Sequence, residues 1–146
     1  MARIAQLEKN VFVASQLTED DFAEIAARGI RSVVNNRPDG EADDQLPSAE
    51  AEAIARRHGL DYRFLPVASH DVTDDEPVDA QTEALRALPG PVLFYCRSGN
   101  RSTILWTQAA AARLGADTVL DRAAGAGFDL EELREFVEDR AEAMAA

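Results

Sequence analysis

Short apolar runs alternate with helical patterns along the 146-residue chain, and this alternation limits the fold more than any other feature. Strands are expected at residues 11–14, 30–34, 62–67 and 92–95. Helices are expected at residues 19–28, 49–58, 78–88, 102–114, 116–124 and 130–143. Because strands that alternate with helices build parallel sheets covered by helices, we expect one α/β domain over residues 1–146. Its sheet should be central, mostly parallel and flanked by helices.

Capping and turn residues support these boundaries. Thr18 precedes three acidic residues and is predicted to cap the first helix, and Ser48 is predicted to cap the second. Gly59 can supply the left-handed residue that ends the second helix, and Pro89-Gly90-Pro91 ends the third. The acidic stretch at residues 70–77 is predicted to be an exposed loop.

The chain carries 27 acidic and 15 basic residues, which give a formal net charge of −12. This charge repels the phosphates of nucleic acids and anionic membrane surfaces, so we expect neither as a partner. The single cysteine cannot form an internal disulfide, which favours the reducing cytoplasm. We also expect no export signal and no membrane-spanning segment. The composition leaves the oligomeric state open.

The segment that leads from a buried strand into a helix carries the clearest chemical pattern. The strand ends at Tyr95, and Cys96-Arg-Ser-Gly-Asn-Arg-Ser102 connects it to the helix. Backbone N–H groups in such a P-loop-like turn converge on an anion, and the helix N-terminus adds favourable potential. Arg101 adds a forked, permanently charged donor. We predict an anion site that also includes Arg97, Ser98, Gly99 and Asn100.

Cys96 is the predicted nucleophile, because the field of the loop amides and Arg101 favours the reactive thiolate. A helix end alone supplies at most about 2 kcal/mol, so other groups must contribute. We expect these to be the loop N–H groups, Arg101 and the hydroxyl of Ser102 or Ser98. A lone cysteine is more often a small buried apolar residue. Its place at a strand end, before small, polar and basic residues, favours catalysis instead.

Other polar residues are candidates for the same site. Hydrolysis of a phosphomonoester by cysteine needs a general acid for the leaving oxygen. Asp71, Asp74 and Asp75 are candidates, with Asp71 our prediction, although a solvated acidic loop would also explain this run. Arg37 and Glu41 follow a strand end and could line the same crevice, with Arg37 in contact with the anion. A simple turn would also explain that segment.

The sequence gives no sign of a metal or another cofactor. His58 and His70 are the only histidines, and neither has a ligand spacing with Cys96 or with paired acids. Trp106 and Phe136 lie at helix positions that core packing would explain. We therefore expect no cofactor.

Four motifs resemble the beta-lactamase hydrolase-like protein, phosphatase-like domain family, and the resemblance covers nearly the whole chain. They are Ser15-Gln16-Leu17, Asn35-Asn36-Arg37-Pro38-Asp39-Gly40-Glu41, Leu65-Pro66-Val67 and Cys96-Arg97-Ser98-Gly99-Asn100-Arg101-Ser102. The resemblance implies a fold related to dual-specificity protein tyrosine phosphatases. In two respects the chain departs from that group: four residues separate Cys96 from Arg101 where the phosphatase signature has five, and Tyr95 stands where histidine is usual.

Three alternative functions remain open for such a site. A six-residue Cys-to-Arg loop is the length that rhodanese-type sulfurtransferases use, so our main hypothesis is sulfur transfer through a Cys96 persulfide. The substrate would be a small sulfur donor, and an external thiol would accept the sulfur. The first alternative is a phosphatase that forms a cysteinyl-phosphate from a small oxyanion substrate. The second is a noncatalytic module that binds an oxyanion.

Overall fold

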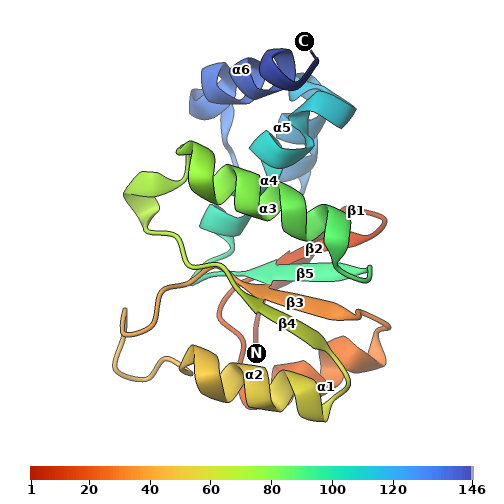
Figure 1. Cartoon of the computed structure of the whole chain (residues 1–146), viewed down its shortest axis with the longest axis vertical. Helices are drawn as coiled ribbons and strands as arrows, with labels where there is room; N and C mark the ends of the chain where they lie inside the picture. Colours follow the sequence, from red (N-terminus) through yellow and green to blue (C-terminus); the bar gives the residue numbers. More distant parts are fainter. Residues whose placement is uncertain (146) are drawn as a thin grey trace.

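The computed structural model describes residues 1–145 and contains a five-stranded sheet between two layers of helices (Figure 1). The strand order is β1-β2-β5-β3-β4. Their bounds are Ile4–Glu8 (β1), Val11–Ala14 (β2), Ser32–Asn35 (β3), Asp61–Phe64 (β4) and Val92–Tyr95 (β5). The last four are parallel to one another, and β1 pairs antiparallel with β2 at one edge. The predicted α/β fold with a mostly parallel sheet is confirmed.

The helices divide unequally between the two faces of the sheet (Figure 1). One face is covered by α1 (Glu19–Ala27) and α2 (Ser48–Arg57). The other lies beneath α3 (Asp75–Ala87), α4 (Asn100–Leu114), α5 (Ala116–Gly125) and α6 (Arg134–Ala145). Short 3-10 helices occur at Ser69–Asp71 and Glu131–Leu133. No helix within residues 1–145 combines the length and apolar character needed to cross a membrane.

The central strand β5 explains how the two layers share one sheet. All four of its side chains are buried, as expected for a parallel strand covered on both faces. Val92 and Phe94 join the core beneath α3 to α6, and Leu93 and Tyr95 join the core against α1 and α2. This alternation places Cys96 at the end of a fully buried central strand of the sheet.

Several predicted boundaries differ from the structure. Strand β1 was not predicted, because it is a half-buried edge strand whose apolar residues do not form a continuous run. Helix α3 begins at Asp75, so part of the predicted exposed loop at residues 70–77 forms its first turn. Acidic residues stabilise that turn through the helix dipole, and Pro77 is tolerated there because its missing N–H is not needed.

Two predictions about single residues also need correction. Ser48 is the first residue of α2 rather than its cap, since Pro47 holds the cap position and the Ser48 hydroxyl lies 2.8 Å from that of Tyr62. Phe136 is 47% exposed on α6 and does not pack in the core, whereas Trp106 is fully buried as expected. Thr18 caps α1, and its N–H donates to the Asp21 carboxylate.

The parallel arrangement brings four strand ends to one edge of the sheet. Strands β2, β5, β3 and β4 all point the same way, so the segments that follow Ala14, Tyr95, Asn35 and Phe64 meet there. In open α/β sheets, ligands bind at the carboxyl ends of the strands. All the predicted site residues belong to these four segments and to the start of α4.

Candidate active site

Cys96 lies at the floor of the loop that joins β5 to α4. Its sulfur accepts a hydrogen bond from the Gly99 N–H at 3.2 Å, and the residue is 1% exposed. Gly99 has a φ of +94°, a left-handed conformation that favours glycine, and its carbonyl accepts hydrogen bonds from the Thr103 N–H and hydroxyl. The loop therefore curls back on the sulfur.

The loop also presents backbone donors that have no partner within the protein. Among residues 1–145, the N–H groups of Arg97, Ser98, Arg101 and Ser102 make no hydrogen bond. The first N–H groups of a helix have no carbonyl one turn earlier in the helix to bond to, so they are free to bind a ligand. Here they follow a tight turn after the nucleophile. Four unused N–H groups within six residues of a cysteine suit an anion with several oxygens.

The Arg101 guanidinium is turned inward and held from one side. Its Nη1 donates to Glu41 Oε2 at 2.8 Å and to the Val67 carbonyl at 3.0 Å, and its Nη2 donates to Glu41 Oε1 at 2.8 Å. Arginine has five N–H donors. These bonds use three of them, so the Nε–H and the second Nη2–H remain. These two lie on one edge of the fork, the edge that binds an oxyanion through two parallel hydrogen bonds.

Electrostatics tie the arginine to both the glutamate and the sulfur. Hydrogen bonds from Arg101, and then from Arg37, lower the pKa of Glu41 from 4.5 to about 2 against the opposing effect of burial. The pKa of Arg101 is raised, first by Glu41 and also by the nearby Cys96. Glu41 is therefore an ionised anchor that fixes the guanidinium beside the nucleophile.

Arg37 is close to the site but does not face the sulfur as Arg101 does. It is 3% exposed; its Nε donates to Glu41 Oε1 at 2.9 Å and its Nη1 to Gln16 Oε1 at 3.0 Å. The backbone N–H of Gln16 in turn donates to the Arg97 carbonyl at 3.1 Å. Arg37 thus links the ends of β2 and β3 to the cysteine loop and positions Glu41.

Ser102 has a different place from the one predicted. Its hydroxyl donates to Asn36 Oδ1 at 2.8 Å, so its one proton is not directed at the sulfur of Cys96. Asn36 also donates to the Leu65 carbonyl and exchanges hydrogen bonds with Gln81 of α3. This buried cluster joins α3 and α4 to the end of β3. Gln81 was missed because a glutamine within an amphipathic helix gives no sequence signal of its own.

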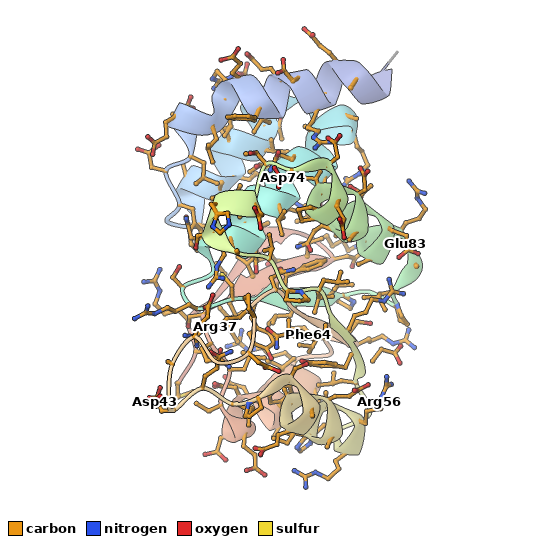
Figure 2. All side chains as sticks on the ribbon, turned by 60° about the vertical axis from the view of Figure 1, so that its left-hand side comes forward. Arg37, Asp43, Arg56, Phe64, Asp74 and Glu83 are labelled. Atoms are coloured by element: carbon orange, nitrogen blue, oxygen red, sulfur yellow. The ribbon has the colours of Figure 1, made fainter. Side chains whose placement is uncertain are left out.

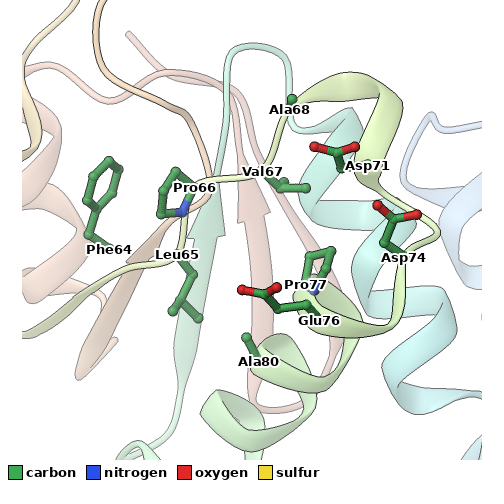
Figure 3. Close-up of a pocket in the computed structure, with 10 residues that line it drawn as sticks. All are labelled: Phe64, Leu65, Pro66, Val67, Ala68, Asp71, Asp74, Glu76, Pro77 and Ala80. Atoms are coloured by element: carbon green, nitrogen blue, oxygen red, sulfur yellow. The ribbon is translucent and has the colours of Figure 1, made fainter.

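Asp71 lines a cavity of about 490 Å³ beside the site. Figure 3 shows the carboxylates of Asp71, Asp74 and Glu76 on one side of this cavity and Phe64 on the other. Val67 also lines the cavity, and its carbonyl holds Arg101. The cavity therefore adjoins the Arg101 anchor, which keeps Asp71 and Asp74 as candidate acids.

The third candidate acid, Asp75, is engaged elsewhere. Its carboxylate pairs with Arg140 of α6 at 2.7 Å. Asp71, by contrast, has no arginine partner among residues 1–145, and its carboxylate lies 3.5 Å from the imidazole of His70. A carboxylate held by an arginine on a distant helix is a poor proton donor, so Asp71 is the better choice of the two.

The remaining predicted anion ligands lie on the outer rim of the loop. Arg97, Ser98 and Asn100 are exposed, while their backbones shape the turn. Arg97 and Arg37 line a second cavity of about 790 Å³ beneath the loop that follows β3. Figure 2 shows Arg37 and Asp43 on that loop, well separated from Asp74 beside α3. Within the described part of the chain no cluster of side chains suits a metal.

Tyr95, which precedes the nucleophile, is fully buried. Its hydroxyl has no hydrogen-bond partner among the described residues. Burial, followed by the neighbouring Tyr62, raises the pKa of the Tyr95 hydroxyl well above its usual value. Tyr95 therefore stays neutral and adds no charge to the site.

Comparisons with known proteins agree with this arrangement. Residues 4–114 match the model of the beta-lactamase hydrolase-like protein, phosphatase-like domain. A beta-lactamase hydrolase-like protein of Xylella fastidiosa is 35% identical over 88% of this chain, and the match spans 30% of that protein's length. The crystal structure of a candidate phosphatase from Neisseria meningitidis is 31% identical, covers 92% of this chain and 96% of its own, and has a TM-score of 0.82.

A more distant structure supports the fold alone. A candidate phosphatase from Shewanella putrefaciens has a TM-score of 0.74 with 15% identity, and the match covers 98% of this chain and 93% of that one. The structures similar to this chain are thus phosphatase-like, and the expected tyrosine phosphatase-like fold is confirmed. They favour the phosphatase alternative over our main hypothesis of sulfur transfer.

Proposed function

Because the chain belongs to the beta-lactamase hydrolase-like protein, phosphatase-like domain family, we propose that it is a cysteine-dependent phosphatase of phosphomonoesters. One observation carries the proposal. The Cys96 sulfur lies within a loop that has four unused backbone N–H groups and is closed by the free edge of Arg101. A phosphoryl group has three oxygens that can accept these hydrogen bonds.

The reaction would proceed in two displacements. The Cys96 thiolate attacks phosphorus, an S–P bond forms, and the P–O bond to the leaving group breaks. Water then attacks the cysteinyl-phosphate, the S–P bond breaks, and inorganic phosphate leaves with the thiolate restored. Arg101 and the loop N–H groups hold the equatorial oxygens in both steps, where the charge develops.

Asp71 is the proposed proton donor to the leaving oxygen in the first step. It lies on the segment after β4, which also supplies the Val67 carbonyl to Arg101. The same carboxylate would accept a proton from the attacking water in the second step. A leaving group in the 490 Å³ cavity would lie beside this carboxylate.

Sulfur transfer is a second candidate, favoured by the six-residue Cys96-to-Arg101 loop. The thiolate would attack the outer sulfur of thiosulfate, an S–S bond would form, and sulfite would leave. An external thiol or cyanide would then attack the terminal sulfur of the persulfide and restore the thiolate. This chemistry needs no acid at Asp71.

Two parallel assays distinguish these reactions. The full chain is incubated with an aryl phosphate in one assay and with thiosulfate and cyanide in the other, each repeated with Cys96→Ser. The phosphatase proposal expects phosphate release that the Cys96→Ser variant lacks, and little thiocyanate. Thiocyanate without phosphate release would replace it with sulfur transfer. Anion binding without turnover in either assay would indicate a noncatalytic module.

A further inference from the structure

The segment after α4 lies outside the region that matches the family model, yet it reaches the cysteine loop. The match ends at residue 114, and α5, the turn after it and α6 follow. In that turn, Phe128 is held by a hydrogen bond from its N–H to the Ala123 carbonyl at 2.8 Å. The Phe128 side chain packs against the core beneath α3 to α6.

Phe128 contacts the one glycine of the cysteine loop. A Cβ atom placed on Gly99 would lie 3.0 Å from Cζ of Phe128 and 3.4 Å from the Ala14 carbonyl oxygen. Gly99 is therefore enclosed between the phenyl ring and the end of β2. Phe128 and Ser98 also line one small cavity of about 220 Å³, which places the ring along the outer side of the loop.

The contact matters because Gly99 carries the hydrogen bond to the nucleophile. Its N–H donates to the Cys96 sulfur at 3.2 Å, and its φ of +94° sets the direction of that bond. Glycine has the widest choice of backbone conformations of any residue. Besides the hydrogen bonds from Thr103 to its carbonyl, packing on both sides of its Cα restricts Gly99, and Phe128 supplies one of those sides.

We propose that Phe128 is a positioning residue: it holds Gly99 in the conformation that directs the N–H at Cys96 and keeps the other loop donors facing inward. The C-terminal helices are then part of the active site. The proposal concerns the reactivity of the thiol and rests on the proposed function only for its turnover assay. Cys96 is the sole cysteine, so alkylation by iodoacetamide adds one mass increment that reports on this sulfur alone.

Four variants of the full chain test the proposal. Phe128→Ala removes the ring, and Phe128→Leu keeps an apolar side chain at the same place. Phe136→Ala is the matched control, since the same residue type on α6 is 47% exposed and, over the residues that the structure describes, no contact with the cysteine loop is seen for it. Val137→Ala is the stability control, because Val137 is fully buried in the same C-terminal segment. All are compared at a temperature at which each is folded.

We expect a lower alkylation rate and a lower turnover in Phe128→Ala than in the other three variants. Alkylation of Cys96 at pH 6 should fall about tenfold, the size expected for one hydrogen bond to a charged group. The kcat for an aryl phosphate should fall by a similar factor with KM within about twofold. Phe128→Leu should recover most of both rates, and the two controls should match the wild type.

Two results would overturn the proposal. One is an alkylation rate of Phe128→Ala within twofold of the wild-type rate. The other is an equal fall of the alkylation rate in Val137→Ala, which would show that lower stability alone slows the reaction. If the wild type does not hydrolyse the phosphate, the proposed function fails while the alkylation rates still decide the role of Phe128. If turnover is normal and alkylation is unchanged in Phe128→Ala, only the role of Phe128 fails.

Discussion

Replacing Glu41 with glutamine should destabilise the protein in a way that depends on pH. The lowered pKa of Glu41, about 2 against 4.5, corresponds to a gain of at most about 3.4 kcal/mol from its charge. The side chain is 30% exposed, so solvent weakens the interaction and we expect about 2 kcal/mol at pH 7. For a chain of this size, that loss lowers Tm by about 4 to 8 °C.

The sign of the pH dependence follows from the direction of the shift. A lowered carboxylate pKa contributes its full stabilisation above the unfolded value of 4.5 and loses it as the pH falls towards 2. At pH 3 less than half of the difference in the free energy of unfolding between the wild type and Glu41→Gln should remain. Below pH 2 the two proteins should be equally stable, as far as this group is concerned.

Urea unfolding at pH 7, 4 and 3 provides the measurement. Glu24→Gln is the matched control, because Glu24 pairs with Arg28 on the exposed face of α1 and that pair should contribute less than about 0.5 kcal/mol. The reasoning would be refuted if Glu41→Gln were as stable as Glu24→Gln at pH 7. A loss of the same size at pH 7 and pH 3 would refute it equally.

Three further substitutions test the site. Arg101→Lys should lower aryl phosphate turnover by about 100-fold, since lysine has no two-donor edge; activity within about fivefold of the wild type would contradict this. Ser102→Ala should lower the free energy of unfolding in urea by about 1 kcal/mol, because the hydrogen bond to Asn36 is lost, and should leave the rate of Cys96 alkylation unchanged. A large fall in that rate would show that Ser102 stabilises the thiolate. Asp71→Asn should slow the hydrolysis of alkyl phosphates by about 100-fold and that of p-nitrophenyl phosphate far less, because a good leaving group needs little help from an acid. Equal slowing of both substrates would show that Asp71 is not the general acid.

The local part of the site could be predicted from the sequence. The strand at Val92–Tyr95, the glycine turn and the following helix depend on neighbouring residues, so the place of Cys96 at a strand end follows from pattern alone. Arg101 was predicted as a donor at the end of the loop, before a helix expected to begin at Ser102, whereas α4 begins at Asn100. These features were predictable because the apolar pattern of neighbouring residues determines strands and helices locally.

The contacts that fix the geometry could not be predicted in the same way. Glu41 meets Arg101 across 60 residues of sequence, and the path of the loop after β3 decides that meeting. Ser102 bonds to Asn36 across 66 residues, so a hydroxyl next to the signature arginine was assigned to the wrong partner. Phe128 lies in a turn that carries no motif, and the packing of α5 against α4 brings it to Gly99.

The pairing of one glutamate with two arginines has a consequence for how strongly the site holds its ligands. When Cys96 is ionised, the guanidinium charges of Arg37 and Arg101 are balanced by two negative charges, those of Glu41 and the thiolate. These four charges sum to zero, so the group requires no counterion from solution, and the inorganic phosphate that a reaction releases gains no net electrostatic attraction there. Replacing the thiolate with a neutral hydroxyl would leave one positive charge in excess without filling the loop, so Cys96→Ser should retain phosphate more tightly than the active form.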